Sequence, residues 1–254
     1  MNKIILITGA TSGFGKASAH KFAANNCDLI ITGRRKEKLD QLKIELEKKY
    51  GVKILPLLFD VQNRDGVFSA IENLPEEWKK IDVLINNAGL ALGRDFFEEA
   101  DIDDWETMLD TNVKGLLYVS KAVLPFMINQ KKGHIINMGS VAAKVAYEKG
   151  NVYCASKAAV ETISETMRID LLRHGIKVTA IHPGAAETEF SDVRFKGNKE
   201  LAKKVYEGYE PLHAEDIANT IFYCTTLPPH VCINDLVITC VAQADSIYFH
   251  KIVG

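Results

Sequence analysis

The sequence predicts an α/β protein built on one doubly wound parallel sheet with helices on both faces. Short apolar runs alternate with amphipathic stretches along the 254 residues, and this alternation is typical of repeated β-α units. Most of the apolar runs lack strict in–out alternation, as expected for parallel strands that are covered on both sides. Because no Pro-, Ser- or Gly-rich linker divides the series, we expect a single domain over residues 1–254.

Seven strands and six helices are expected. The strands are predicted at residues 4–8, 28–32, 53–59, 83–86, 134–138, 177–182 and 235–239. The helices are predicted at residues 15–26, 35–50, 64–78, 101–130, 151–174 and 214–225.

Two segments depart from this alternation. The polar stretch 187–209 follows the carboxyl end of a strand, where open α/β sheets bind ligands, so we expect a substrate lid at about residues 185–209. The tail at 242–254 contains Ile247, Tyr248 and Phe249 and is too apolar for a free end. It can pack on its own domain or on a neighbouring subunit.

The composition excludes several classes of protein. The formal net charge is −2 at pH 7, without the basic excess of a nucleic-acid-binding protein. No apolar run approaches the roughly 20 residues that span a bilayer, so we expect no membrane partner. The five cysteines are scattered, with no Cys-x-x-Cys pair and no histidine at ligand spacing. We therefore expect no metal site, reduced thiols and a cytoplasmic protein.

A glycine-rich turn joins the first strand to the first helix, in the order Thr8-Gly9-Ala10-Thr11-Ser12-Gly13-Phe14-Gly15. Glycines let the backbone approach a pyrophosphate, and the N–H groups at a helix start attract an anion. The spacing differs from the commoner G-x-G-x-x-G, and such a turn alone is a weak signal. Its position between a strand and a helix favours a Rossmann-type dinucleotide site. The expected contacts are Gly9, Thr11, Ser12, Gly13, Phe14 and Gly15.

Two arginines, Arg34 and Arg35, follow the second strand. An acidic residue here, about 20 residues past the turn, would bind the ribose 2′-hydroxyl of NAD. Guanidinium groups instead match a phosphate, so the arginines favour the 2′-phosphate of NADP. The alternative is that they are the solvated start of the next helix.

Two further strand ends suit the same cofactor. Asp60 and Val61 follow the third strand, where we expect a contact to the adenine ring. Asn86, Asn87, Ala88 and Gly89 end the fourth strand, where small residues admit the cofactor. Alternatively, the asparagines fix backbone turns.

Tyr153 and Lys157 lie four residues apart in a predicted helix and share one face. A free tyrosine has a pKa of about 10, too high for a good base near neutrality. A nearby ammonium favours the phenolate, so we expect Lys157 to lower the pKa of Tyr153. The phenol could then exchange a proton with a substrate hydroxyl while a hydride leaves or reaches the same carbon. Taken alone, Tyr-x-x-x-Lys is usually an ordinary helix face.

Two polar residues are expected beside this pair. Ser140 follows the fifth strand, where its hydroxyl can donate a hydrogen bond to the substrate oxygen; the alternative is a serine that caps a turn. Asn112 falls inside the long helix predicted at 101–130, although asparagine is unfavourable in a helix interior. We expect it to distort that helix and hold a water for Lys157. The alternative is an exposed helical asparagine.

Together these motifs resemble the short-chain dehydrogenase/reductase family over essentially the whole chain. The resemblance rests on the turn at 8–15, Asn86-Asn87-Ala88-Gly89, Asn112, Ser140, Tyr153, Lys157 and Pro183-Gly184. It implies that Asn112, Ser140, Tyr153 and Lys157 form a catalytic tetrad and that Lys157 also binds the nicotinamide ribose. It further implies that Thr188, after Pro183 and Gly184, anchors the nicotinamide carboxamide. The family's usual assembly implies a homotetramer paired through the helices that contain Asn112 and Tyr153.

Longer phrases are similar to the NADP-dependent 3-hydroxy acid dehydrogenases of this family, which include the serine and allo-threonine dehydrogenases. The phrases lie at 87–93, 104–108, 150–153 and 188–197. This resemblance implies reversible oxidation of the hydroxyl of small acids such as serine, allo-threonine or 3-hydroxyisobutyrate. The segments 144–149 and 185–187 depart from the group and border the expected substrate pocket.

Recognition of such an acid requires a partner for its carboxylate inside a closed site. We expect Arg194 to bind the carboxylate because its planar fork matches it; the alternative is a surface charge on a loop. Tyr147 and Phe190 are expected to wall the pocket or simply to pack. Competing functions are a reductase of 3-oxoacyl thioesters or sugars on the same scaffold and a non-catalytic NADP-binding sensor.

Overall fold

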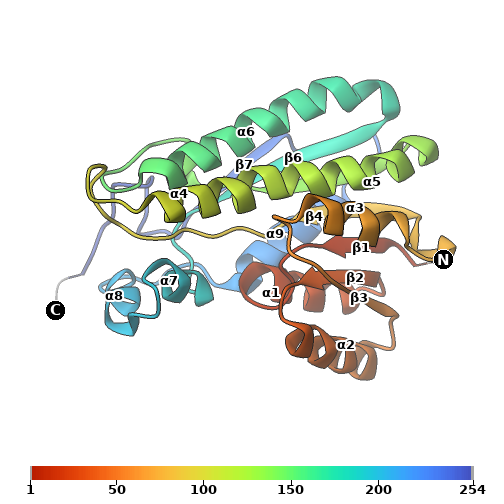
Figure 1. The fold of residues 1–254 in the computed structure, drawn as a ribbon, viewed down its shortest axis with the longest axis horizontal. Helices are drawn as coiled ribbons and strands as arrows, with labels where there is room; N and C mark the ends of the chain where they lie inside the picture. The colour runs from red at the N-terminus through yellow and green to blue at the C-terminus, as the bar shows by residue number, and fades with distance from the viewer. Residues whose placement is uncertain (1, 253–254) are drawn as a thin grey trace.

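The computed structural model describes residues 2–252, and their strands form one seven-stranded sheet in which all neighbours run parallel. The strands are β1 (Ile4–Ile7), β2 (Asp28–Gly33), β3 (Ile54–Leu58), β4 (Ile81–Asn86), β5 (Gly133–Met138), β6 (Ile176–Pro183) and β7 (Asp235–Ile238). Their order is β3-β2-β1-β4-β5-β6-β7 (Figure 1). The winding reverses between β1 and β4, which leaves a crevice at the carboxyl edge. The predicted α/β fold with its doubly wound parallel sheet is confirmed.

Side chains of β1 show why the strands are apolar on both faces. Ile5 and Ile7 belong to one hydrophobic core, whereas Leu6 belongs to the core on the opposite face of the sheet. All three are fully buried. Every strand lies within two residues of its predicted ends, because continuous apolar runs of this length fit only a sheet covered on both sides.

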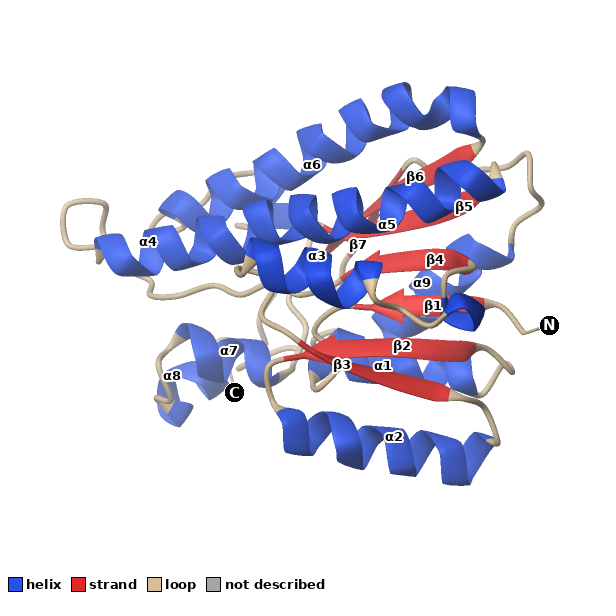
Figure 2. Ribbon diagram, turned by 45° about the vertical axis from the view of Figure 1, so that its right-hand side comes forward, coloured by secondary structure: helices blue, strands red, loops and turns tan. Residues whose placement is uncertain are grey.

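Helices cover the two faces of the sheet (Figure 2). One face carries α1 (Gly13–Ala23), α2 (Lys36–Tyr50) and α9 (Ala214–Thr226); the other carries α3 (Arg64–Glu72), α5 (Leu116–Gln130) and α6 (Asn151–Leu171). Phe22 of α1 and Ile221 of α9 share the first core, and burial of such side chains stabilises the fold by about 1.5–3 kcal/mol each. Among residues 2–252, no helix combines the length and apolar character needed to cross a membrane.

The helix predicted at 64–78 is wrong at its end. It stops at Glu72, and a separate 3-10 turn covers Glu76–Trp78. Pro75 lies between the two. Its ring disfavours a helical conformation at the residue before it, and proline has no N–H with which to continue the helix.

The single helix predicted at 101–130 is also divided. It consists of α4 (Ile102–Leu109), a π-helical turn (Asp110–Gly115) and α5. Gly115 closes the π-helical turn against the loop after β3, where a Cβ on the glycine would lie 2.7 Å from Val61 Cγ2. The wider turn brings the backbone of this region close to the carboxyl edge of the sheet.

The segment 185–209 and the tail pack on each other. The segment contains two short helices, α7 (Glu189–Arg194) and α8 (Lys199–Lys204). The Ile252 amide donates to the Gly208 carbonyl at 2.8 Å, and the rings of Phe249 and Tyr209 lie 5.2 Å apart. Residues 242–252 of the tail therefore pack on their own domain; the last two residues of the predicted tail lie outside the described residues.

Buried His134 in β5 generates a prediction about acid stability. Its Nε2 lies 2.7 Å from Thr179 Oγ1, and the Thr179 hydroxyl itself donates to the Ile233 carbonyl, so Nε2 must be the donor. Burial lowers the pKa of His134 to about 3, whereas an unfolded histidine has a pKa of about 6.5. Between these values only the unfolded chain takes up the proton, so stability falls as the pH drops.

We expect the free energy of unfolding to fall by about 1.5 kcal/mol more in the parent than in His134→Leu between pH 6.5 and 5.0. Leucine cannot titrate, and it leaves the Thr179 hydroxyl bonded to Ile233. Urea unfolding of both proteins at the two pH values measures the difference. Equal losses in parent and variant would show that His134 does not control acid stability.

Candidate active site

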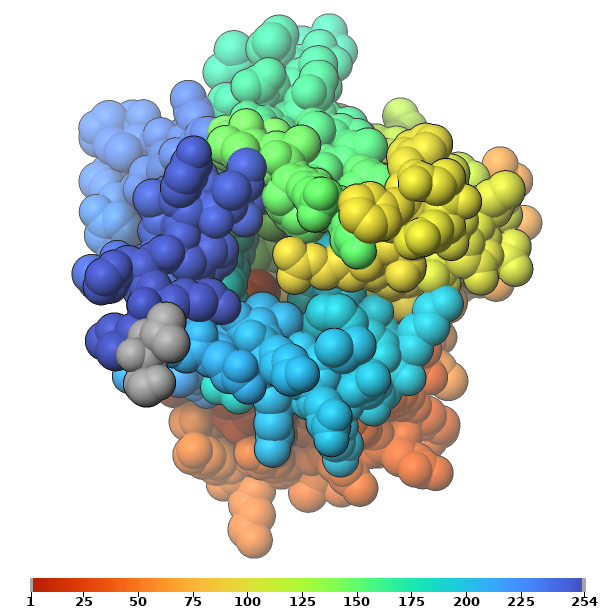
Figure 3. Space-filling model, turned by 90° about the vertical axis from the view of Figure 1, so that its left-hand side faces the viewer, coloured from red at the N-terminus to blue at the C-terminus, as the bar shows by residue number. Residues whose placement is uncertain are grey.

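A cleft of about 1110 Å³ opens at the carboxyl edge of the sheet. Figure 3 looks into it: the cyan segment 185–209 and the dark-blue tail lie on one side, with residues 90–100 in yellow and 140–150 in green across from them. This volume exceeds the roughly 300–1,000 Å³ of pockets for drug-sized molecules. The cleft therefore has room for a dinucleotide together with a small substrate.

The glycine turn after β1 forms the floor of the cleft. Gly9 and Gly13 have φ values of +65° and +48°, a conformation that favours glycine. A Cβ on Gly15 would lie 2.3 Å from the Gly9 carbonyl oxygen, so no side chain fits there. In the described part of the chain, the Ser12 side chain makes no capping hydrogen bond at α1 and the first turn carries no acidic residue. The start of α1 thus presents N–H groups suited to an anion.

Asn87 joins the turn to the loop after β4. Its Nδ2 donates to the carbonyls of Thr8 at 2.8 Å and Gly9 at 3.2 Å. In return, the amides of Asn87 and Ala88 donate to Thr8 Oγ1 at 3.0 and 2.9 Å. The alternative that Asn87 fixes the backbone is therefore correct, and it fixes the edge of the cleft.

Arg35 lies at the far end of the cleft and is already held in place. Its Nε and Nη2 donate to Thr11 Oγ1 at 3.1 and 2.8 Å, and its Nη1 lies 3.1 Å from Glu189 Oε2 of α7. Lys38 Nζ lies 3.5 Å from the other Glu189 oxygen. Although partial burial raises the pKa of Glu189, these two cations hold it below its usual value. The 185–209 segment is thus tied to the loop after β2.

Arg34 pairs with the end of β3. Its Nη1 lies 3.4 Å from Asp60 Oδ2, and both side chains are partly exposed. Such pairs contribute about 0–1 kcal/mol, so they can exchange readily for a phosphate. Val61, the next residue, is buried and lines the cleft.

Tyr153 and Lys157 face the cleft together from α6, and both are buried. Lys157 Nζ lies 6.0 Å from the centre of the Tyr153 ring and donates to the Met138 carbonyl at 2.9 Å. Ser140 Oγ accepts from the Ala142 amide at 3.1 Å and faces the Tyr153 phenol. The turn-capping alternative for Ser140 is therefore correct, yet its hydroxyl proton is left to donate elsewhere.

The expected lowering of the Tyr153 pKa is wrong. Burial and the neighbouring Tyr147 raise the pKa of Tyr153 above its usual value, and the opposing effects of Ser140 and Arg194 are smaller. Burial also lowers the pKa of Lys157 to about 8. The lysine is not among the main influences on the phenol; with a pKa of about 8, it has already lost its charge at the pH where the phenol ionises.

Asn112 lies in the π-helical turn and is buried. Its Oδ1 accepts from the Leu90 amide at 2.8 Å, and its Nδ2 donates to the Leu90 carbonyl at 2.8 Å and to Ser156 Oγ at 3.0 Å. The expected helix distortion is present, and the alternative of an exposed asparagine is wrong. A Cβ on Gly89 would lie 3.2 Å from Asn112 Oδ1 and 3.5 Å from Lys157 Nζ, so the two side chains converge there.

The residues after β6 lie across the cleft from the glycine turn and close it on that side. The Gly184 amide donates to the Ile238 carbonyl at 2.8 Å, which holds the turn that begins at Pro183. Thr188 caps α7 by accepting from the Phe190 amide at 3.2 Å. A Cβ on Gly13 would lie 3.5 Å from Thr188 Cβ, so the two loops meet over the glycine turn.

The side chains expected to bind substrate gather around Tyr153. Phe190 packs against it with ring centres 5.8 Å apart. Arg194 Cζ lies 5.4 Å from the centre of the Tyr153 ring and 5.5 Å from that of Tyr147. Arg194 Nε donates to the Gly93 carbonyl at 3.3 Å, so the guanidinium is held inside the cleft. The alternative of a surface charge on a loop is wrong.

Three residues of the cleft region were missed from the sequence. Lys38 reaches Glu189 from one helical turn beyond Arg35, a spacing that could have been recognised. Glu189 itself looked like part of a polar loop. Arg94 lies 5.9 Å from the centre of the Tyr147 ring. The two residues are far apart in the sequence, so no local pattern indicates this contact.

A family model described as short chain dehydrogenase matches residues 3–199. The chain belongs to the short-chain dehydrogenase family. It is 48% identical over 242 residues to the NADP-dependent 3-hydroxy acid dehydrogenase YdfG of Salmonella typhi, covering 95% of this chain and 96% of that protein. It is 45% identical over 249 residues to sulfoacetaldehyde reductase 2 of Chromohalobacter salexigens, with 98% of each covered.

A solved structure of this family is also similar over the full length. It is the closed form of a serine dehydrogenase complexed with NADP+, with a TM-score of 0.91 and 43% identity. The alignment covers 98% of this chain and 100% of that one.

Proposed function

We propose that the protein is an NADP-dependent dehydrogenase that reversibly oxidises the hydroxyl of small 3-hydroxy acids. The observation that carries the proposal is Arg194, whose Cζ lies 5.4 Å from the centre of the Tyr153 ring. An anion-binding group thus stands beside the phenol that can move a proton. The names of the relatives, a 3-hydroxy acid dehydrogenase and a serine dehydrogenase, support the same chemistry.

The cleft suits NADP because glycines keep its floor open and arginines lie at its far end. The glycine turn and the start of α1 would hold the pyrophosphate, and Arg34 and Arg35 the 2′-phosphate. The remaining contacts would come from Asp60 and Val61 to the adenine, Tyr153 and Lys157 to the nicotinamide ribose, and Asn87, Ala88, Gly89, Pro183, Gly184 and Thr188 along the nicotinamide half. When bound, NADPH would supply the hydride for reduction and NADP+ would accept it in oxidation.

Tyr153 is the proton donor and acceptor in this proposal. Because burial raises the pKa of Tyr153, the phenol is protonated at neutral pH and can donate to a carbonyl oxygen that is being reduced. Ser140 can donate a second hydrogen bond to that oxygen. The Lys157 ammonium, with a pKa of about 8, can exchange protons near neutral pH, and Asn112 holds the backbone beside it.

Arg194 would bind the carboxylate of the substrate while the 3-hydroxyl faces Tyr153 and Ser140. Tyr147 and Phe190 form apolar walls around that position. The segment 185–209 carries both Arg194 and Phe190, so it would act as the lid that excludes water around the reacting carbon.

A second candidate substrate class is a small aldehyde that carries a sulfonate. Arg94 and Arg194 both line the cleft and lie within 6 Å of the Tyr147 ring centre, so a second guanidinium is available near the one expected to bind an anionic head group. A relative named sulfoacetaldehyde reductase supports this candidate.

A panel of serine, allo-threonine, 3-hydroxyisobutyrate, 3-hydroxypropionate, sulfoacetaldehyde and a 3-oxoacyl thioester, each with NADP(H) and NAD(H), separates the classes. Binding of NADPH without any turnover would favour a sensor instead.

We further propose a cytoplasmic homotetramer. Large apolar side chains remain exposed on helices of one face of the molecule: Leu109 at the end of α4, Leu117 on α5 and Ile169 on α6. A second copy packed on these helices would cover them. All five cysteines are free thiols, four of them buried, which suits a reducing compartment.

We expect Tyr153→Phe to lower kcat by at least about 100-fold, the usual contribution of a general acid. The affinity for NADPH should fall by no more than about tenfold, since the ring remains in place and at most one hydrogen bond to the ribose is lost. Steady-state kinetics and a fluorescence titration with NADPH measure the two quantities. Tyr223→Phe, on the surface of α9, is the matched control. Unchanged kcat in Tyr153→Phe would overturn the role of the phenol.

We expect Arg34→Ala combined with Arg35→Ala to lower kcat/KM with NADP by about 100-fold, because hydrogen bonds to a charged phosphate are lost. The value with NAD should change little, since NAD lacks that phosphate. Lys36→Ala is the control, because Lys36 points to Asp40 on the surface of α2. If the parent enzyme used NAD and NADP equally well, the assignment of the arginines would be wrong.

We expect Arg194→Met to raise KM for 3-hydroxy acids by about 10- to 100-fold, as expected for the loss of one charge-assisted contact. KM for a neutral alcohol of the same size should stay within about twofold of the parent value. Lys196→Met provides the comparison, since Lys196 pairs with Asp104 at 2.9 Å outside the cleft. Equal KM values for serine in the parent and in Arg194→Met would show that the substrate carboxylate does not bind at Arg194.

A further inference from the structure

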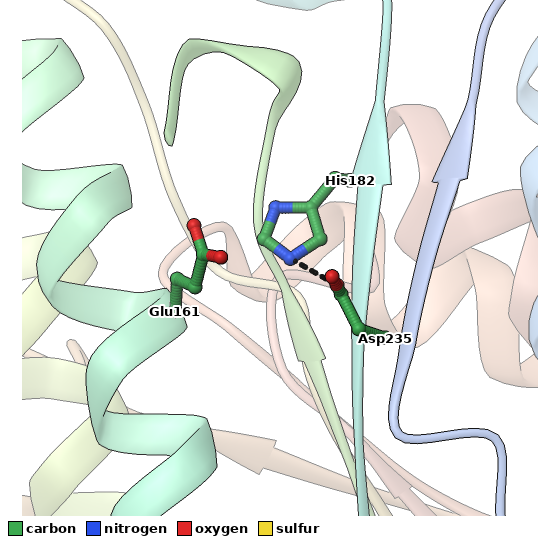
Figure 4. Close-up of side chains that lie close together, drawn as sticks. All are labelled: Glu161, His182 and Asp235. Carbon is green, nitrogen blue, oxygen red and sulfur yellow. Dashed lines mark ion pairs between the residues drawn. The ribbon is translucent and has the colours of Figure 1, made fainter. Parts of the chain in front are cut away.

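A cluster of three titratable side chains lies next to Ser140 but is not used in the proposed chemistry. His182 of β6, Asp235 of β7 and Glu161 of α6 converge, as Figure 4 shows. His182 Nε2 lies 2.8 Å from Asp235 Oδ1, and the imidazole is fully buried. A fully buried imidazole that contacts a carboxylate has a fixed orientation, so its other nitrogen is also held in place.

The cluster does not need a metal ion to balance its charge. The Lys144 ammonium contacts the carboxylates of both Glu161 and Asp235, at 2.5 Å from Asp235 Oδ2. A metal ion would have to displace this lysine. The cluster can therefore act through the other side of the imidazole ring, at His182 Nδ1.

That other side faces the backbone of Ser140. His182 Nδ1 lies 3.3 Å from the Ser140 amide nitrogen and 3.1 Å from the Ser140 carbonyl oxygen. A Cβ on the preceding Gly139 would lie 2.4 Å from the same nitrogen. Only glycine at position 139 therefore lets the imidazole pack this closely against the peptide that leads into Ser140.

Asp235 decides which role Nδ1 takes. A lone pair on Nε2 would repel the Asp235 carboxylate oxygen 2.8 Å away, so the neutral ring carries its proton on Nε2 and leaves a lone pair on Nδ1. That lone pair can accept from the Ser140 amide. Burial lowers the pKa of His182 below its usual value, and Lys144 adds to this, against raising effects of Asp235, the Ser140 backbone and Glu161. The ring is therefore neutral at pH 7.

We propose that His182, with its tautomer fixed by Asp235, is a positioning residue that holds the Ser140 amide and thereby aims the Ser140 hydroxyl at the reacting oxygen. The inference rests on the role of Ser140 in the proposed function. Among residues 2–252, the hydrogen bond that holds Ser140 Oγ comes from the Ala142 amide, so the direction of the hydroxyl depends on the orientation of the peptide at 140. Without an acceptor at Nδ1, a buried amide loses its partner, and a rotated peptide becomes favourable.

The experiment compares His182→Leu with His182→Asn. Leucine fills space but accepts no hydrogen bond, whereas the asparagine oxygen can take the place of Nδ1. We expect kcat in His182→Leu to fall by about 100-fold, the effect of a small misplacement of a catalytic group, with KM and NADPH affinity within about threefold. His182→Asn should recover kcat to within about fivefold of the parent. Glu161→Gln, which removes a charge of the cluster without touching Ser140, should leave kcat within about threefold of the parent value.

Thermal unfolding of each variant separates positioning from support of the fold. Unchanged kcat in His182→Leu overturns the inference. Equal loss of kcat in His182→Leu and His182→Asn, in proportion to lost stability, overturns it as well. Ser140→Ala separates a failure of the proposed function from a failure of the positioning role of His182. If it keeps full kcat, the proposed chemistry fails at Ser140; if it is slow while His182→Leu is not, only the positioning role fails.

Discussion

The hydrogen bonds between Asn87 and the glycine turn determine the geometry of the cleft. They join the loops after β1 and β4, the two strands between which the winding reverses. A Cβ on Gly15 would lie 2.3 Å from the Gly9 carbonyl oxygen, and one on Gly9 would lie 3.0 Å from Ala88 Cα, so a side chain is excluded at the first position and crowded at the second. The start of α1 is therefore held on one side of the junction and Gly89 on the other. Lys157 and Asn112 meet beside Gly89, so these two members of the proposed tetrad are positioned relative to the floor of the cleft.

Burial has opposite effects on the two titratable neighbours in this cleft. It raises the pKa of Tyr153 and lowers the pKa of Lys157 to about 8, and both shifts disfavour a phenolate–ammonium pair. A neutral phenol is an acid, so these groups by themselves favour reduction of a carbonyl. Oxidation requires the phenol to lose its proton, and the groups that lower its pKa, Ser140 and Arg194, are those that also face the substrate position. The same contacts would then serve binding and proton transfer.

The fold and most of the candidate site follow from local patterns in the sequence. Continuous apolar runs indicate buried parallel strands, and residues just after such strands share one edge, which is why Ser140 could be placed beside Tyr153 and Gly89 along the cofactor. The π-helical turn at Asn112 could be expected only as a distortion, because its form depends on hydrogen bonds to Leu90, distant in sequence. The raised pKa of Tyr153 was missed because burial is a property of the whole fold. A spacing of four residues indicates which side chains are neighbours but not how much water surrounds them.

The distribution of charge along the cleft supports one orientation for its ligands. At the end near β2, Arg34 and Arg35 pair with Asp60 and Glu189, but these pairs are partly exposed and contribute only about 0–1 kcal/mol each. A phosphate carries more charge than a carboxylate and can replace either partner. At the opposite end, Arg194 donates to the Gly93 carbonyl and makes no ion pair with any residue from 2 to 252, so its charge is available to a ligand. Between the two ends, the phenol is neutral. In the proposed reaction, a doubly charged phosphate would therefore bind at the arginine pair and a small singly charged acid at Arg194, with its reacting carbon over Tyr153.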